Sequence, residues 1–173
     1  MTAKIKKILN EQIREEFYSS YLYLAFSGYL NNNNLKGAAN WMHIQAQEEV
    51  DHAIGLFRFL LDREEEPELQ VIDKPKMEDI KDIEAVFAAS LKHERHISEC
   101  INKIYEAARE EKDYALESFI KWYIDEQVEE EANAMDIIGK LKMVGADKAS
   151  LYLLDQELAA RVYVPSGPYA AKK

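Results

Sequence analysis

Glutamates at four widely separated positions have the residue type and spacing needed to hold metal ions. Each of them interrupts, once, a stripe of apolar residues that recurs every seven positions. These residues are Glu16, Glu49, Glu94 and Glu130. Seven residues turn an α-helix by about 20° less than two full turns, so the members of each stripe share one helix face. The pattern predicts that the carboxyl groups point into a hydrophobic interior at a similar depth.

Burial of these carboxyl groups side by side indicates bound cations. An ionised carboxylate without a partner costs several kcal/mol to bury, and neighbouring carboxylates also repel each other. Multivalent cations would relieve both costs. His52 follows Glu49 by three positions, an E-x-x-H motif that places both side chains on one helix face. Oxygen ligands with an imidazole suit iron, manganese or zinc better than copper or an iron–sulfur cluster.

The expected ligands form two unequal metal positions. Di-iron carboxylate bundles take a glutamate from each of two helices and an E-x-x-H motif from each of the other two. The last helix departs from this set, because Gln127 precedes Glu130 by three positions and no histidine follows. The expected ligands are Glu16, Glu49 and His52 for the first ion and Glu49, Glu94 and Glu130 for the second. The second ion lacks a nitrogen ligand, so we expect it to bind more weakly and to leave more readily.

Other residues near these stripes have two interpretations each. Glu48, Glu126 and Glu129 lie about 100° away from the main stripes. They form either a solvated acidic face or a functional group, which would be a third iron position or an exit route. Tyr23, one heptad after Glu16, is either a core tyrosine with a satisfied hydroxyl or a donor of an electron or hydrogen bond to the metal site.

The segments that carry these residues have helical periodicity. Apolar residues recur at helical spacing over residues of about 4–30, 36–63, 80–110 and 113–144, and over a shorter segment of about 148–160. Asp113 and Asp147 are the expected N-caps of the last two helices, and Gly145 is the expected C-cap between them. The asparagine run 31–34 and the prolines of segment 65–79 indicate non-helical links.

The lengths of the links predict the topology. Short links join the first two long segments and the last two, which makes two antiparallel hairpins. The middle link of about 15 residues could stretch to roughly 50 Å, enough to pass a helix of about 40 to 46 Å. We therefore expect one all-α domain over 1–173 with a single long crossover. Its four-helix bundle would cover about 4–144, and its short fifth helix about 148–160, followed by a tail over 161–173.

Composition excludes several classes of protein. The net charge of −10 argues against nucleic acid as a partner, because phosphate binding needs Lys and Arg. No apolar run reaches the length of about 18 residues that spans a membrane, and the N-terminus has no apolar signal-peptide core. The one cysteine, Cys100, cannot form an internal disulfide or a paired-cysteine metal site, so a cytoplasmic location is expected.

Several motifs resemble those of bacterial and archaeal non-haem ferritins, over about residues 5–160. The stretches that carry the resemblance are LNEQI at 9–13, EFYSSYLY at 16–23, GA at 37–38, QEE with the following His52, KHE at 92–94, WY at 122–123 and EQVEEE at 126–131. The resemblance implies a hollow shell of twenty-four subunits in which Fe(II) enters through channels and ferric mineral is deposited. The short fifth helix corresponds to the helix that packs around the fourfold axis of such shells.

The resemblance also implies a ferroxidase centre that oxidises Fe(II) with O2 or H2O2, with Glu49 as a bridging ligand. Its first site corresponds to Glu16, Glu49 and His52. Its second corresponds to Glu49, Glu94 and Glu130, with Gln127 nearby. The third site of bacterial-type ferritins corresponds to Glu48, Glu126, Glu129 and Glu130. Tyr23 falls on the tyrosine beside the centre.

Neighbouring families lack support. A haem-binding bacterioferritin would carry methionine where Val50 stands, so no haem is expected. A rubrerythrin would need a cysteine-rich domain, and a DNA-protecting mini-ferritin would lack the fifth helix. A rival hypothesis is a non-enzymatic helical interaction protein in which hydrogen bonds, rather than metals, satisfy the buried glutamates. Sedimentation would separate a large shell from a dimer.

Overall fold

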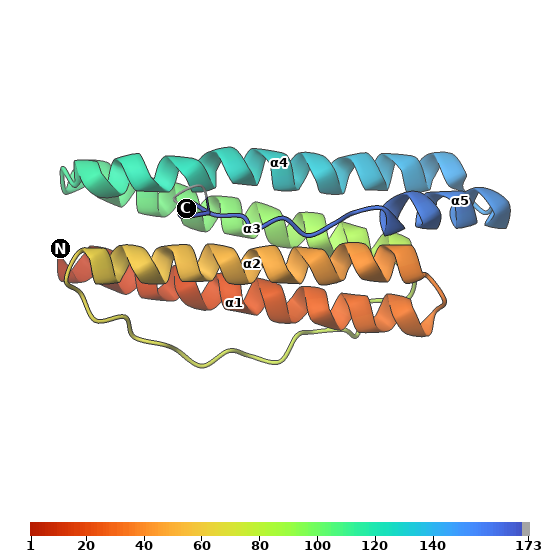
Figure 1. The fold of residues 1–173 in the computed structure, drawn as a ribbon, viewed down its shortest axis with the longest axis horizontal. Coiled ribbons are helices and arrows are strands. Elements are labelled where there is room, and N and C mark those ends of the chain that lie inside the picture. The colour runs from red at the N-terminus through yellow and green to blue at the C-terminus, as the bar shows by residue number, and fades with distance from the viewer. Residues whose placement is uncertain (171–173) are drawn as a thin grey trace.

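The computed structural model describes residues 1–170, in which four long helices lie side by side and a short fifth helix sits at one end (Figure 1). The helices are α1 (Ala3–Asn32), α2 (Lys36–Asp62), α3 (Ile83–Glu110), α4 (Tyr114–Val144) and α5 (Lys148–Ala159). The link between α2 and α3 runs along the bundle, and no strand occurs in the described range. The predicted all-α bundle with one long crossover and a short fifth helix is confirmed. Positions 171–173 of the predicted tail lie outside the described residues.

Two predicted helix boundaries are wrong by two or three residues. α1 continues to Asn32 instead of ending at Leu30, because Asn33 caps it with its backbone N–H and Asn34 takes a left-handed φ of 60°. Asparagine adopts that conformation more readily than most residues. α3 begins at Ile83 rather than at position 80, because the carboxylate of Asp82 accepts a hydrogen bond from the Ala85 N–H at 2.7 Å.

The caps predicted for the last two helices are confirmed. Asp113 accepts from the backbone N–H of Leu116 at 3.1 Å, and Asp147 accepts from that of Ser150 at 2.8 Å. Gly145 ends α4 with a φ of 55°, a left-handed conformation that glycine adopts without a steric penalty. These caps fix where α4 begins and ends, and so fix the depth of its buried glutamate.

The core consists of two apolar clusters with a polar layer between them. One cluster gathers around Phe26 and Phe87, and the other gathers around Leu56 and Ile120. The buried polar residues between the clusters include Gln12, Glu16, Gln45, Glu49, His52, Glu94, Gln127 and Glu130. Within the described chain, no helix has the length and apolar character that crossing a membrane requires.

Candidate metal centre

The glutamates that interrupt the apolar stripes all point inward, as predicted. Glu16 is 1% exposed, Glu49 and Glu94 are each 2% exposed, and Glu130 is 4% exposed. They come from four different helices and meet near the middle of the bundle, because each stripe faces the shared core. The geometry therefore collects four carboxyl groups in a region that excludes water.

Three of the predicted ligands lie close enough to hold one cation. Ligand atoms of Glu16, Glu49 and His52 all lie within 4.8 Å of one another. Nδ1 of His52 is 3.3 Å from Oε2 of Glu49, as the E-x-x-H spacing predicts. Two carboxylates and one imidazole form a ligand set suited to a divalent transition metal.

Glu16 also carries a buried oxygen that lacks a protein partner. The side-chain amide of Gln12 donates to Oε1 of Glu16 at 2.9 Å. Over the described residues, Oε2 of Glu16 is the buried side-chain polar atom that makes no hydrogen bond. Because buried polar atoms are rarely left unsatisfied, this oxygen is the atom a cation would best satisfy. The residues present thus fit a metal ion at this position.

The other two glutamates lie in the same layer, each held by an amide. Nε2 of Gln127 donates to Oε2 of Glu94 at 3.0 Å, and Nε2 of Gln45 donates to Oε2 of Glu130 at 2.7 Å. Gln45 also contacts Oε1 of Glu49 at 3.4 Å. Within the described chain, Glu94 and Glu130 do not join a cluster of three close ligands. The predicted ligands of the second ion are therefore buried in the same layer, but their ligand atoms do not form a close cluster.

Tyr23 is buried in contact with this layer. Its hydroxyl donates a hydrogen bond to Oε1 of Glu94 and lies 3.4 Å from Oγ of Ser90. This arrangement fits the interpretation of Tyr23 as a core tyrosine with a satisfied hydroxyl, and its role as a donor to the metal site stays a prediction. The hydroxyl orients one expected ligand, Glu94.

Burial raises the pKa of three of the acids. Burial, followed by the charge of Glu49, raises the pKa of Glu16 to about 8 and that of Glu130 to about 8. Burial, followed by the charge of Glu130, raises the pKa of Glu94 well above its ordinary value. At neutral pH Glu16 and Glu130 would therefore hold protons that an incoming cation displaces.

Glu49 and His52 behave in the opposite way. Burial opposes the charge on both, but their mutual hydrogen bond and attraction outweigh it. The pKa of Glu49 is held below its ordinary value, and that of His52 is raised to about 10. The two side chains therefore form a buried ion pair, and a metal ion bound to them would replace the proton of the imidazolium.

The residues predicted for a third ion lie on the α2 and α4 side of the centre. Glu48 and Glu126 are half-buried, and Glu129 is exposed. Oε1 of Glu126 lies 3.8 Å from Nε2 of His52, whereas Glu48 forms an ion pair with Arg161. Burial raises the pKa of Glu48 and of Glu126. Glu48 and Glu126 border the centre, and the side chain of Glu129 is open to solvent, so the third ion position stays a prediction.

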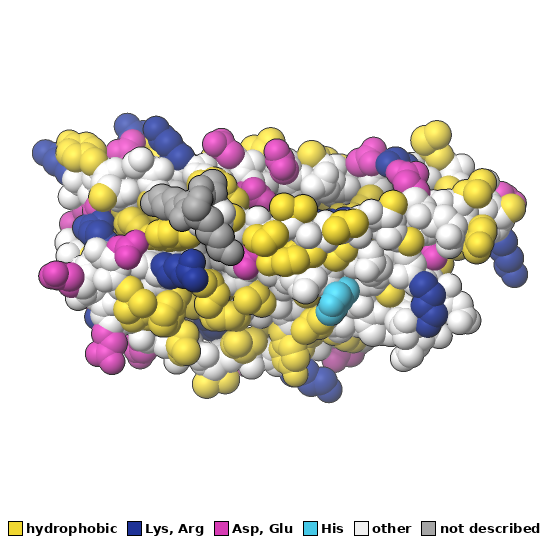
Figure 2. All heavy atoms as spheres, viewed as in Figure 1, with side chains coloured by type: hydrophobic (Ala, Val, Ile, Leu, Met, Phe, Trp, Pro, Cys, Tyr) yellow, Lys and Arg dark blue, Asp and Glu magenta, His cyan; other side chains and the backbone are white. Residues whose placement is uncertain are grey.

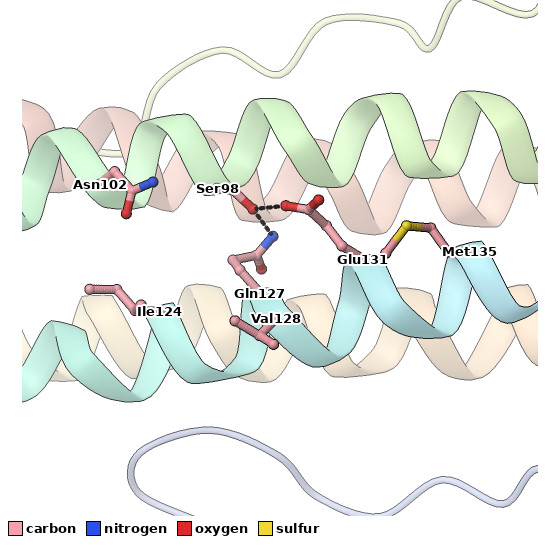
Figure 3. A pocket seen from close by; sticks show the side chains of 7 residues that line it. All are labelled: Ser98, Asn102, Ile124, Gln127, Val128, Glu131 and Met135. Carbon is pink, nitrogen blue, oxygen red and sulfur yellow. Dashed lines mark hydrogen bonds between the residues drawn. The ribbon is translucent and has the colours of Figure 1, made fainter.

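A groove lies between α3 and α4 and reaches the buried side chain of Gln127 (Figure 3). It has a volume of about 310 Å³ and is lined by Ser98, Asn102, Ile124, Gln127, Val128, Glu131 and Met135. Figure 3 shows Ser98 hydrogen-bonded to two neighbours: it donates to Glu131 at 2.6 Å and accepts from Gln127 at 3.5 Å. Because Gln127 also holds Glu94, it lies between the groove and the buried carboxyl groups.

Sequence reasoning missed several residues around the centre. Gln12 and Gln45 each precede a buried glutamate by four positions, a helical spacing that could have identified them as partners. Arg161 and Ser166 reach the centre from the tail, which has no periodicity to interpret. His93 is also half-buried beside the layer, and its Nε2 lies 2.7 Å from Oγ of Ser19.

Comparisons with known proteins agree with this arrangement. The family described as Ferritin-like domain matches residues 6–144. The bacterial non-heme ferritin of Campylobacter jejuni is 37% identical over 156 residues, which cover 90% of this chain and 93% of that protein. The bacterial non-heme ferritin of Staphylococcus epidermidis is 36% identical over 163 residues, which cover 94% of this chain and 98% of that protein.

Solved structures give the same result. An Archaeoglobus fulgidus ferritin engineered into a closed form has a TM-score of 0.92 at 40% identity, over 95% of this chain and 99% of that chain. A ferritin from the same archaeon, described as having an open pore, has a TM-score of 0.91 at 41% identity, over 94% of this chain and 98% of that chain.

Proposed function

The chain belongs to the ferritin family, whose members store iron, and we propose that it oxidises Fe(II) to Fe(III) at the buried carboxylate layer. The observation that carries this proposal is the cluster of Glu16, Glu49 and His52 within 4.8 Å, next to a carboxyl oxygen with no protein partner. One Fe(II) ion would bind there. A second would bind to Glu49, Glu94 and Glu130, so that Glu49 bridges the pair.

The chemistry balances with the protons that the layer holds. Each of two Fe(II) ions gives up one electron. O2 takes both electrons and two protons to become H2O2, and H2O2 as oxidant would take the same to become two waters. Glu16 and Glu130, whose pKa burial raises to about 8, would release protons when cations bind, close to where the oxidant consumes them. Carboxylates also favour the higher charge of Fe(III), which lowers the free energy of the oxidised product.

The remaining residues have supporting roles in this proposal. Gln127 orients Glu94 and offers no nitrogen ligand, so the second ion would leave more readily than the first. Tyr23 gives its one hydroxyl hydrogen to the other oxygen of Glu94, so in this proposal it would supply an electron, rather than a second hydrogen bond, to the oxidant. Glu48, Glu126 and Glu129 would take a third ion on its way out.

The iron would be stored inside a shell of twenty-four subunits, in the cytoplasm. The similarity to ferritin structures described by their open or closed pores supports such an assembly. Exposed apolar residues support it as well, among them Tyr152 and Leu153 of α5, which are 64% and 68% exposed. Figure 2 shows further apolar side chains at the surface over α2 and the tail. The single cysteine is compatible with a reducing compartment.

Stopped-flow absorbance after aerobic addition of Fe(II) tests the oxidation. Glu49→Gln and His52→Ala should lose the fast phase of oxidation, while Glu106→Gln, a change at an exposed position of α3, should keep it. Sedimentation of all variants checks that assembly is unchanged. Fast oxidation by Glu49→Gln and His52→Ala would favour the rival hypothesis, in which hydrogen bonds alone satisfy the buried acids.

A further inference from the structure

The tail that follows α5 lies along one face of α2 and is tied to it at several points. It runs between α2 and α4 in the same direction as α2 (Figure 1). Nη1 of Arg161 donates to Oε1 of Gln45 at 2.8 Å, and further along the hydroxyl of Tyr169 donates to Oδ2 of Asp62 at 2.6 Å. The tail is therefore docked over most of the length of α2.

The middle of the tail is fixed next to the metal centre by Asp51. Oδ2 of Asp51 accepts from the Tyr163 hydroxyl at 2.6 Å and from the backbone N–H of Ser166 at 3.0 Å. Gly167 then takes a φ of 108°, which side chains rarely permit, and an added Cβ would lie 3.4 Å from the Asp51 carbonyl oxygen. This turn sets the position of Ser166.

A second glycine, on α2, lets the tail approach. A Cβ at Gly55 would lie 2.5 Å from the hydroxyl of Tyr123 and 3.1 Å from Cδ of Pro168. A side chain at this position would therefore displace the Tyr123 hydroxyl and crowd the tail at Pro168. Together, Gly55 and Gly167 allow backbone-close packing directly beside His52.

The tail also contacts His52, an expected ligand of the first ion. Its Nδ1 faces Glu49 at 3.3 Å, and its Nε2 lies 3.0 Å from Oγ of Ser166. The ring is 2% exposed and packs edge-on against Trp122 at 5.3 Å between centroids. An imidazole that binds a metal through one nitrogen carries a hydrogen on the other, and that hydrogen needs an acceptor.

We propose that Ser166 is a positioning residue of the metal centre, whose hydroxyl accepts from Nε2–H of His52 and holds Nδ1 toward Glu16 and Glu49. The inference rests on the proposed function, because it assigns His52 as a ligand. Glu126, the other acceptor near Nε2, is 3.8 Å away, beyond hydrogen-bond distance. The tail thus supplies a contact that orients the ligand, from more than a hundred residues away in the chain.

Binding of Co(II) to the assembled, iron-free protein tests this role without any turnover. Co(II) reports both affinity and ligand geometry through its visible absorption. Ser166→Ala should weaken binding of the first ion by about tenfold and change the absorption band, since outer partners of ligating histidines have effects of about that size. Ser166→Thr, which keeps a hydroxyl, should restore both. Ser118→Ala, at an exposed serine of α4, is the matched control.

Displacement of the Ser166 hydroxyl provides a second, independent test of the proposal. Gly167→Ala keeps Ser166 but strains the turn that places it, so it should reproduce the loss seen with Ser166→Ala. Parent-like affinity and absorption in Ser166→Ala would overturn the proposal, as would an equal loss in Ser166→Ala and Ser166→Thr. If His52→Ala also bound Co(II) like the parent, the metal centre itself would be wrong. If His52→Ala lost Co(II) affinity and Ser166→Ala did not, only the role of Ser166 would be rejected.

Discussion

The amide of Gln12 donates to one oxygen of Glu16, at 2.9 Å, and the second oxygen of that buried carboxyl group makes no hydrogen bond within the described residues. The residue one turn earlier in α1 therefore satisfies one oxygen of Glu16 and leaves the other oxygen directed into the carboxylate layer. Such an arrangement favours cation binding at a cost to the stability of the metal-free protein.

Replacement of Glu16 by leucine should separate these two effects. Leu has a similar volume and needs no hydrogen bond, so Glu16→Leu should raise the free energy of unfolding of the metal-free protein by about 1 to 4 kcal/mol. The same variant should lose the first metal site. Thermal scans of metal-free protein, compared with Glu106→Leu as an exposed control, measure the first effect. A lower melting temperature for Glu16→Leu would contradict this account of the carboxyl group.

The pH dependence of stability has a definite sign. The folded state raises the pKa of Glu16 and of Glu130 to about 8, so it binds protons that the unfolded chain has lost. The stability that these two acids contribute to the folded state is complete below about pH 4.5 and is lost as the pH rises through about 8. His52, raised to about 10, adds stability below its ordinary value of about 6.5 that is lost as the pH rises through about 10.

Metal-free protein should therefore melt at lower temperatures as the pH is raised from about 5 to about 8. Glu16→Gln, which is neutral at every pH, should make this decline shallower. Differential scanning calorimetry of both proteins in the presence of a chelator measures the slope. A melting temperature that rises over this range would show that the acids are not buried in protonated form.

The groove side of the centre can be altered through Gln127. Gln127→Glu replaces an amide that donates to Glu94 with a fourth carboxylate beside the second metal position. Extra ligand charge strengthens cation binding, so the second ion should bind about tenfold more tightly and leave more slowly. Anaerobic calorimetric titration with Fe(II) measures the affinity. Unchanged affinity of the second ion would indicate that Gln127 lies outside its reach.

The stripes that predicted the buried glutamates succeeded because a helix repeats nearly every seven residues. Glu130, for example, shares its stripe with Tyr123 and Ile137, and all three are buried. The depth of that stripe also followed from the sequence, since Asp113 and Gly145 mark the ends of α4. A regular element with clear caps is thus predictable from its residues alone.

The tail was not predictable, because its position depends on side chains paired across the whole chain. Arg161 contacts Glu48, and Ser166 contacts His52, but no local sequence pattern predicts either contact. The start of α3 was also missed: Ile80 continues the apolar spacing, but the cap at Asp82 decides where the helix begins. Local hydrogen bonds overrode periodicity there, and tertiary contacts decided the tail.

Arg161 is expected to compete with a third metal ion. Its guanidinium pairs with Glu48, contacts Gln45 at 2.8 Å and lies over the ring of Trp41 at 4.2 Å, so it is a cation held beside the expected exit route. An ion that binds Glu48 and Glu126 must displace this charge or approach against its repulsion. The charge of Arg161 also lowers the pKa of Glu48 against the larger effect of burial.

Removal of this charge should therefore strengthen the third site. Arg161→Gln should increase the affinity of the third ion by about fivefold, equivalent to about 1 kcal/mol, and affect the first two ions less. Titration calorimetry with Zn(II), which is not oxidised, resolves the three binding steps. Lys121→Gln removes the same charge from an exposed position of α4 and should leave the third ion unchanged. Equal affinities in the two variants would mean that Arg161 only anchors the tail, because a competing cation must affect binding when it is removed.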